Sequence, residues 1–190
     1  MQIDLKENLN KFKIKKDKET LEKNEIDASI FKITPKGVFV PENKKQLVDF
    51  VREVIDIKTK QDNQSINKKQ NEDTVSISSR AAGTCMSGGS LTSGYMISFT
   101  EHINNIISID VKNDAENSNR HTIIVEPGLF YKDMEKETLK HGLILPSYPA
   151  SRELCAIGGM VGNNGAGEKT IKYGKTEKYV EEIEMICADG

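Results

Sequence analysis

The sequence has 190 residues, a mass of 21.2 kDa and a net charge of −2, which suits one domain or two small ones with a buried core. A nearly balanced charge gives no general attraction to nucleic acid or to anionic membranes. No apolar run reaches the roughly 18 residues of a membrane-spanning helix, and the charged N-terminus lacks the apolar stretch of a signal peptide. We therefore expect a soluble, cytoplasmic protein.

Cysteine and histidine side chains are scattered along the chain, with Cys85, Cys155 and Cys187 far apart. A zinc site normally uses close pairs of these residues, so no metal site is expected. We interpret the cysteines as reduced thiols that serve mainly in packing.

The first 24 residues form a leader rich in lysine and glutamate. Leu5, Leu9 and Phe12 give this leader only a weak helical pattern of apolar residues. We therefore expect residues 1–24 to be a solvated helix that precedes a domain spanning residues 25–190.

A strand and an amphipathic helix open the expected domain. Val38–Val40 is a short β-type run, and Asn43 can cap a helix because Gln46 stands three residues further on. The apolar residues of this helix recur at helical spacing, namely Leu47, Phe50, Val51 and Val54. Residues 56–74 are polar with isolated isoleucines, and they predict a surface loop.

Further strands are expected in the middle of the chain, where short runs alternate or are rich in β-branched residues. They are Val75–Ser78, Tyr95–Phe99, Ile106–Val111 and His121–Val125. The polar residues 112–120 between the last two runs predict a hairpin turn.

The C-terminal part mixes helix, glycine-rich segments and a last predicted strand. Pro127-Gly128 precedes an expected helix over residues 130–140, which Gly142 can end in the left-handed conformation. Val180–Ala188 alternates imperfectly and predicts a strand, followed by the turn signal Asp189-Gly190. Short strands mixed with helices, without regular βαβ alternation, indicate the α+β fold class.

The first glycine-rich segment, Arg80–Gly89, follows a predicted strand. Its glycines allow close backbone approach, so that several N–H groups can face one anion, usually a diphosphate. Taken alone, such a segment is more often a tight turn between strands. It does not match the dinucleotide fingerprint G-x-G-x-x-G at the start of a helix.

The second glycine-rich segment, Ile157–Thr170, has nearly the spacing of a nucleotide-binding P-loop. Glu168 stands between Gly167 and Lys169 and moves the lysine out of register, which excludes an ATPase. The backbone can still lie against a flat ligand, with Asn163 and Asn164 as hydrogen-bonding groups. Two such segments, each beside a strand, predict one elongated, phosphate-bearing ligand held at two points.

Several segments in the same order resemble the FAD-linked oxidases of the vanillyl-alcohol-oxidase type, which carry a PCMH-type FAD-binding domain. The resemblance is closest to the glycolate oxidase and D-lactate dehydrogenase branch. It is carried by Asp27–Phe31 with Thr34-Pro35, Arg80–Gly89, Val125–Gly128, His141–Pro146, Ile157–Gly167, Lys172–Lys175 and Ala188–Gly190. It implies two small α+β lobes, about residues 25–78 and 79–190, with FAD between them.

The resemblance implies that the first segment presents backbone N–H groups to the FAD pyrophosphate, while later residues line the flavin and ribityl groups. The implied cofactor-binding residues are Arg80, Ala81, Ala82, Gly83, Thr84, Cys85, Ser87, Gly88, Pro149, Ser151, Gly158, Gly159, Asn163, Gly165 and Gly167. Thr84 stands where relatives with covalent flavin carry a histidine, so non-covalent FAD is expected. Ala81 and Ala82 replace common glycines and require negative φ.

In the family, the flavin domain continues beyond the point matched by Gly190, and a substrate-binding domain follows. The second lobe is therefore expected to be incomplete, with the missing half on the same or a partner polypeptide. We name no catalytic residue, although Arg152 or Lys172 could reach an anionic substrate. An unpaired final strand would make this chain poorly soluble alone.

Three functions stay open at this point. The first is the FAD-binding portion of an enzyme that oxidises a small 2-hydroxy acid of the glycolate or D-lactate type by hydride transfer to flavin. The second is a non-catalytic remnant with weak or no FAD binding, which Ala81 and Ala82 favour. The third is a cell-wall precursor reductase using NADPH, which the match of Ile157–Gly167 to the hydroxy-acid branch disfavours.

Overall fold

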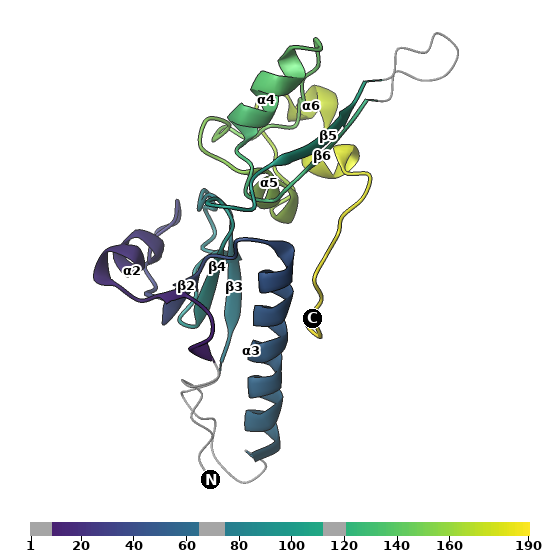
Figure 1. The fold of residues 1–190 in the computed structure, drawn as a ribbon. Helices are drawn as coiled ribbons and strands as arrows, with labels where there is room; N and C mark the ends of the chain where they lie inside the picture. The colour runs from purple at the N-terminus through teal and green to yellow at the C-terminus, as the bar shows by residue number, and fades with distance from the viewer. Residues whose placement is uncertain (1–8, 65–74, 112–120) are drawn as a thin grey trace. The chain divides into compact units, whose positions relative to one another are not determined.

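The computed structural model describes residues 9–64, 75–111 and 121–190. Two compact units make up the chain (Figure 1). The first comprises Met1–Arg80, Cys85–Ser98 and Ile183–Gly190, and the second comprises Ala81–Thr84 and Phe99–Glu182. Tyr95–Ser98 thus belongs with the N-terminal residues, because it pairs with two of their strands. This strand had been expected in the later lobe, and the expected lobe limits stay a prediction.

A four-stranded sheet forms the centre of the first unit. Its order is β1 (Ile14–Lys15), β2 (Gly37–Phe39), β4 (Tyr95–Ser98) and β3 (Ile77–Arg80). The β1 strand runs antiparallel to β2, whereas β2, β4 and β3 are parallel neighbours. Val38 and Met96 are paired on the two central strands and are almost fully buried, as expected for a parallel sheet.

The α3 helix (Lys44–Gln64) carries the apolar residues that the sequence predicted. Asn43 Oδ1 accepts a hydrogen bond from the Gln46 N–H at 3.0 Å, which confirms the expected cap. The helix runs to Gln64, so the loop expected for residues 56–74 is wrong in its first half. Ile57 is fully buried one turn after Val54 and extends the apolar face of the helix. Residues 65–74 lie outside the described part.

The N-terminal segment packs into the first unit. Leu9 is only 3% exposed, and the Phe12 ring lies edge-on to Phe39 and Phe50, with centroids 5.6 and 5.2 Å away. Ile14 pairs with Phe39 in the sheet. The α2 helix (Lys18–Asn24) follows, capped by Asp17. The expectation of a solvated helix is therefore wrong for residues 9–15, because Leu9 is buried and the half-buried Phe12 packs on the rings of Phe39 and Phe50.

The second unit begins with two antiparallel strands, β5 (Ile106–Asp110) and β6 (Thr122–Val125). Their pairing confirms the expected hairpin, although its turn lies outside the described residues. The α4 helix (Tyr131–Leu139) then ends in a Schellman motif, in which the Leu143 N–H donates to Thr138 O at 3.1 Å. Gly142 has φ +70° in this motif, as the sequence predicted.

The core of the second unit lies between α4, the β5–β6 pair and α5 (Ile157–Gly162). Its buried residues are Leu129, Tyr131, Met134, Tyr148, Cys155 and Met160. Two short helical turns follow, α6 (Thr170–Tyr173) and the 3₁₀ helix η1 (Thr176–Tyr179).

The last segment of the chain does not form the strand expected at Val180–Ala188. Within the described residues it pairs with no other strand, and Ile183 and Met185 are more than half exposed. The Gly190 N–H does donate to Cys187 O at 2.9 Å, so the turn signal is confirmed. Because this segment is not a strand, it presents no unpaired strand edge of the kind from which poor solubility was expected.

None of the helices within the described ranges combines the length and apolar character needed to cross a membrane.

Candidate functional site

Residues 27–31 hold the second half of the first glycine-rich segment in place. Asp27 accepts hydrogen bonds from the Ser29 N–H at 2.8 Å and from the Ser90 hydroxyl at 3.2 Å. Gly88 has φ +76°, and a Cβ at this position would lie 2.9 Å from the Phe31 ring. Only glycine therefore fits at this position, both for its conformation and for the space available.

Arg80 lies at the end of β3, where the chain enters the first glycine-rich segment. Its Nη1 atom is buried and has no hydrogen-bond partner among the described residues. Burial lowers the pKa of Arg80 and the Asp27 charge opposes that effect, but a guanidinium remains a cation at neutral pH. A buried, unpaired N–H group is costly unless a ligand or water accepts from it. The guanidinium therefore fits an anionic ligand such as a phosphate.

The two glycine-rich segments meet within the second unit. A Cβ at Gly159 would lie 3.5 Å from the Ala81 Cβ, so Ala81 lies beside α5 with room for a side chain between them. Gly83 has φ +71°, as a tight turn requires. Asn164 is the one non-glycine residue with positive φ among the described residues, so Ala81 and Ala82 avoid strain as predicted. The structure thus brings Ala81 close to the helix that carries Gly158 and Gly159.

Gly158 serves a packing role within α5. A Cβ here would lie 2.7 Å from the Pro127 Cβ, and the Gly158 N–H donates to Pro127 O at 2.8 Å. The glycine therefore lets α5 approach the turn that precedes α4. The sequence analysis assigned this residue only to the cofactor.

The Pro149–Ser151 turn and the Gly165–Gly167 loop also meet. A Cβ at Gly167 would lie 2.1 Å from Tyr148 O, so only a glycine allows this contact. Residues 149–155 form a turn, in which Pro149 O accepts from the Arg152 N–H at 3.0 Å and Ser151 O accepts from the Cys155 N–H at 2.8 Å. The Ser147 hydroxyl beside this turn is fully buried and has no partner among the described residues.

The two asparagines after α5 differ in their surroundings. Asn164 is occupied within the fold, because its Oδ1 accepts from the Glu177 N–H at 3.0 Å and its Nδ2 donates to the Glu177 carboxylate at 2.7 Å. The exposed Asn163 ends α5, and its N–H donates to Gly159 O at 3.0 Å.

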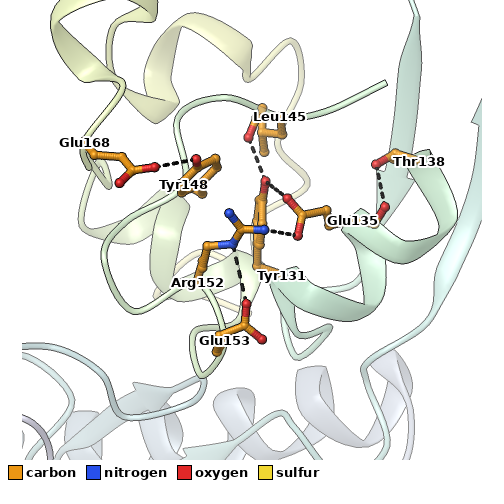
Figure 2. Close-up of polar contacts among 8 residues, drawn as sticks. All are labelled: Tyr131, Glu135, Thr138, Leu145, Tyr148, Arg152, Glu153 and Glu168. Carbon is orange, nitrogen blue, oxygen red and sulfur yellow. Dashed lines mark hydrogen bonds and ion pairs between the residues drawn. The ribbon is translucent and has the colours of Figure 1, made fainter. Parts of the chain in front are cut away.

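Arg152 is engaged in a cluster of polar and aromatic side chains, shown in Figure 2. Its guanidinium pairs with Glu135 at 2.7 Å and with Glu153 at 3.5 Å, and it lies over the Tyr148 ring. Two carboxylates thus neutralise the cation that the sequence analysis considered for an anionic substrate. Tyr131 and Glu135 are four residues apart on α4, but no sequence pattern joins them to Arg152.

The cysteines are all free thiols, and two of them are packing residues. Cys155 is 2% exposed within the core, and burial raises the pKa of its thiol. Cys85 is buried, with its sulfur 3.1 Å from the Ser87 hydroxyl. Cys187 is exposed in the C-terminal segment.

Comparison with known proteins identifies the family. A family model described as an FAD binding domain matches residues 51–190. The chain is 34% identical over 120 residues to the glycolate oxidase subunit GlcD of Bacillus subtilis, covering 63% of this chain and 24% of that protein. It is 31% identical over 127 residues to the D-lactate dehydrogenase of Archaeoglobus fulgidus, covering 66% and 27%.

Among solved structures, an alkyldihydroxyacetonephosphate synthase matches with a TM-score of 0.67 at 17% identity, over 94% of this chain and 32% of that chain. At this identity the match shows a common fold, and it confirms the α+β class expected from the resemblance. The chain spans about a quarter of the length of the curated relatives it matches.

This chain belongs to the FAD-binding domain family of FAD-linked oxidoreductases, and FAD is the cofactor of that family. The resemblance drawn from the sequence is thereby confirmed. The residues present fit such a cofactor, because Arg80 has a buried guanidinium nitrogen with no partner among the described residues, and the backbone at Gly167 lies directly against Tyr148 O.

Proposed function

We propose that this chain is the FAD-binding portion of an oxidoreductase that oxidises a small 2-hydroxy acid. The observation that carries the proposal is the closeness of Ala81 to α5, where a Cβ at Gly159 would lie 3.5 Å from the Ala81 Cβ. It brings together the two glycine-rich segments that the sequence linked to one extended ligand. The relatives named for glycolate and D-lactate support the substrate class. The residues that bind the substrate are proposed to lie on further polypeptide, in the same or in a partner chain.

The proposed cofactor contacts follow the residues named from the sequence. Residues 80–88 would bind the diphosphate through backbone N–H groups and the Arg80 cation, and the segments 149–151 and 158–167 would line the flavin side. FAD supplies an acceptor for the two electrons removed when a hydroxyl becomes a carbonyl. Thr84 offers no imidazole for a covalent flavin link, so the proposed binding is non-covalent.

One observation that favoured a non-catalytic remnant no longer does so. That interpretation rested in part on Ala81 and Ala82, and neither has a positive φ. These alanines therefore form the loop without the strain that a left-handed alanine would introduce.

The substrate class is tested by anaerobic reduction of the flavin in the FAD-loaded protein isolated from its natural source. Glycolate and D-lactate should bleach the flavin band near roughly 450 nm, a property of the cofactor, whereas acetate and propionate should not. Acetate and propionate are the matched controls because they lack only the hydroxyl group. Bound flavin that no 2-hydroxy acid reduces would favour the non-catalytic reading.

A further inference from the structure

A buried carboxylate anchors one side of the turn that carries Pro149 and Ser151. Glu135 lies on α4 and is 7% exposed. It accepts hydrogen bonds from Arg152 Nη2 at 2.7 Å and from the Tyr131 hydroxyl at 3.1 Å (Figure 2). A carboxylate buried to this extent is stable only when cationic and hydrogen-bonding groups contact it. The Arg152 side chain must therefore stay beside Glu135.

Arg152 is both a partner of Glu135 and a member of the turn. Its side chain reaches Glu135, while its backbone N–H donates to Pro149 O at 3.0 Å. The guanidinium carbon lies 4.6 Å from the centroid of the Tyr148 ring, which places the planar group over an aromatic face. Burial acts to lower the pKa of Arg152, but the hydrogen bond and charge of Glu135 outweigh it and raise the pKa.

The other end of the turn is anchored by Tyr131, which is fully buried. Its hydroxyl donates to Leu145 O at 2.8 Å, just before Pro146. Burial, followed by the charge of Glu135, raises the pKa of Tyr131 well above its ordinary value, so the hydroxyl stays protonated and can donate. Residues 146–151 are therefore fixed at both ends by neighbouring side chains of α4.

Tyr148 connects this turn to the second glycine-rich segment. Its hydroxyl donates to Glu168 at 2.8 Å, and the Lys169 ammonium lies 5.2 Å from its ring centroid. Gly167 packs directly on Tyr148 O. The turn at 146–152 and the loop at 165–169 thus form one assembly whose position depends on Tyr148.

We propose that Arg152 is a positioning residue for FAD: held between the Glu135 carboxylate and the Tyr148 ring, it fixes the turn that presents Pro149 and Ser151 to the flavin. This inference rests on the proposed function, because it assumes that these two residues line the flavin. Arg152 itself touches Glu135, Glu153 and Tyr148, and it acts on the cofactor through the turn.

The test compares the purified wild-type protein with Arg152→Gln and Arg152→Lys, in titrations with FAD and with ADP. Arg152→Gln should weaken FAD binding about tenfold or more while leaving ADP binding within about twofold, because only FAD carries the flavin. Arg152→Lys keeps the charge and should recover part of the affinity. Hydrogen exchange of the amides at 147–155 should become faster in Arg152→Gln.

Glu153→Gln is the matched control, since it removes the exposed partner of Arg152 and leaves the buried one. It should bind FAD as the wild type does. Equal FAD affinity in wild type and Arg152→Gln, or equal losses of affinity for FAD and ADP, would overturn the positioning role of Arg152. Neither result would contradict the proposed function. A wild-type protein that binds ADP but not FAD would refute the proposed function and this inference together.

Discussion

Individual glycines determine how closely the segments of the candidate site approach one another. Gly88 and Gly142 have positive φ, and the sequence predicted the left-handed conformation of Gly142 from its place after a helix. Gly167 is different, because its backbone is ordinary and the requirement comes from Tyr148, nineteen residues earlier in the chain. The need for glycine at such a position depends on tertiary contact and is not readable from local spacing.

Gly167→Ala should therefore destabilise the protein and weaken FAD binding, because the new Cβ would lie 2.1 Å from Tyr148 O. We expect a loss of about 1–3 kcal/mol in the free energy of unfolding, measured by urea titration. Gly162→Ala is the control, since no heavy atom lies within 4 Å of a Cβ at this helical position. It should raise stability by roughly 0.5–1 kcal/mol. Equal effects of the two substitutions would contradict the packing described for Gly167.

Asp27 gives the first unit a defined pH dependence. Burial acts to raise the pKa of its carboxyl, but hydrogen bonds from Ser29 and Ser90 outweigh it and lower the pKa below the ordinary 3.8. The carboxylate therefore stabilises the folded state above about pH 4. This contribution is lost as the pH falls through the lowered pKa.

Asp27→Asn should lower the free energy of unfolding by about 1 kcal/mol at neutral pH. An amide group has only one acceptor oxygen, so the Ser90 hydroxyl would lose the oxygen to which it donates. The difference from wild type should stay constant from pH 8 to pH 5 and shrink below pH 4. Urea titrations across this range provide the measurement. A difference that grows with acidity would mean that the carboxyl is not stabilised as an anion.

At the scale of elements, the α3 helix shows where sequence patterns stop being informative. Its first half was predicted from a cap and a regular apolar stripe, whereas its second half is polar except for Ile55 and Ile57. Ile57 is nevertheless fully buried, and its polar sequence neighbours do not indicate this. The strand expected at Val180–Ala188 failed for a related reason, since a strand needs a partner that its own sequence does not specify.

Ile57→Ala should destabilise the first unit by about 2–5 kcal/mol, as for other fully buried aliphatic residues. Lys58→Ala, at the next and exposed position of the same helix, should change stability by no more than about 0.5 kcal/mol. Thermal and urea unfolding of both variants test whether α3 continues beyond residue 56. If the Ile57→Ala protein were as stable as the Lys58→Ala protein, the helix would not continue here and the loop predicted from the polar sequence would be correct.

At the scale of the whole molecule, the family and the cofactor were predictable because the motifs recur in a fixed order along most of the chain. Each glycine-rich segment alone is ambiguous, although Glu168 excluded the P-loop and the missing G-x-G-x-x-G pattern excluded the Rossmann fingerprint. The cluster around Arg152 was not predictable, because its members come from α4 and from a turn more than ten residues further on. The fold class followed from short strands mixed with helices, and the structural match confirms it.

The most direct test of this account is the visible absorption spectrum of the purified protein, recorded after FAD is added and unbound FAD is removed by desalting. We predict flavin bands near roughly 370 and 450 nm that stay with the protein and are released into solution by acid, as for a bound, non-covalent cofactor. A protein that emerges colourless would contradict the proposed FAD binding by these residues. Flavin that stays with acid-precipitated protein would contradict the non-covalent attachment inferred from Thr84.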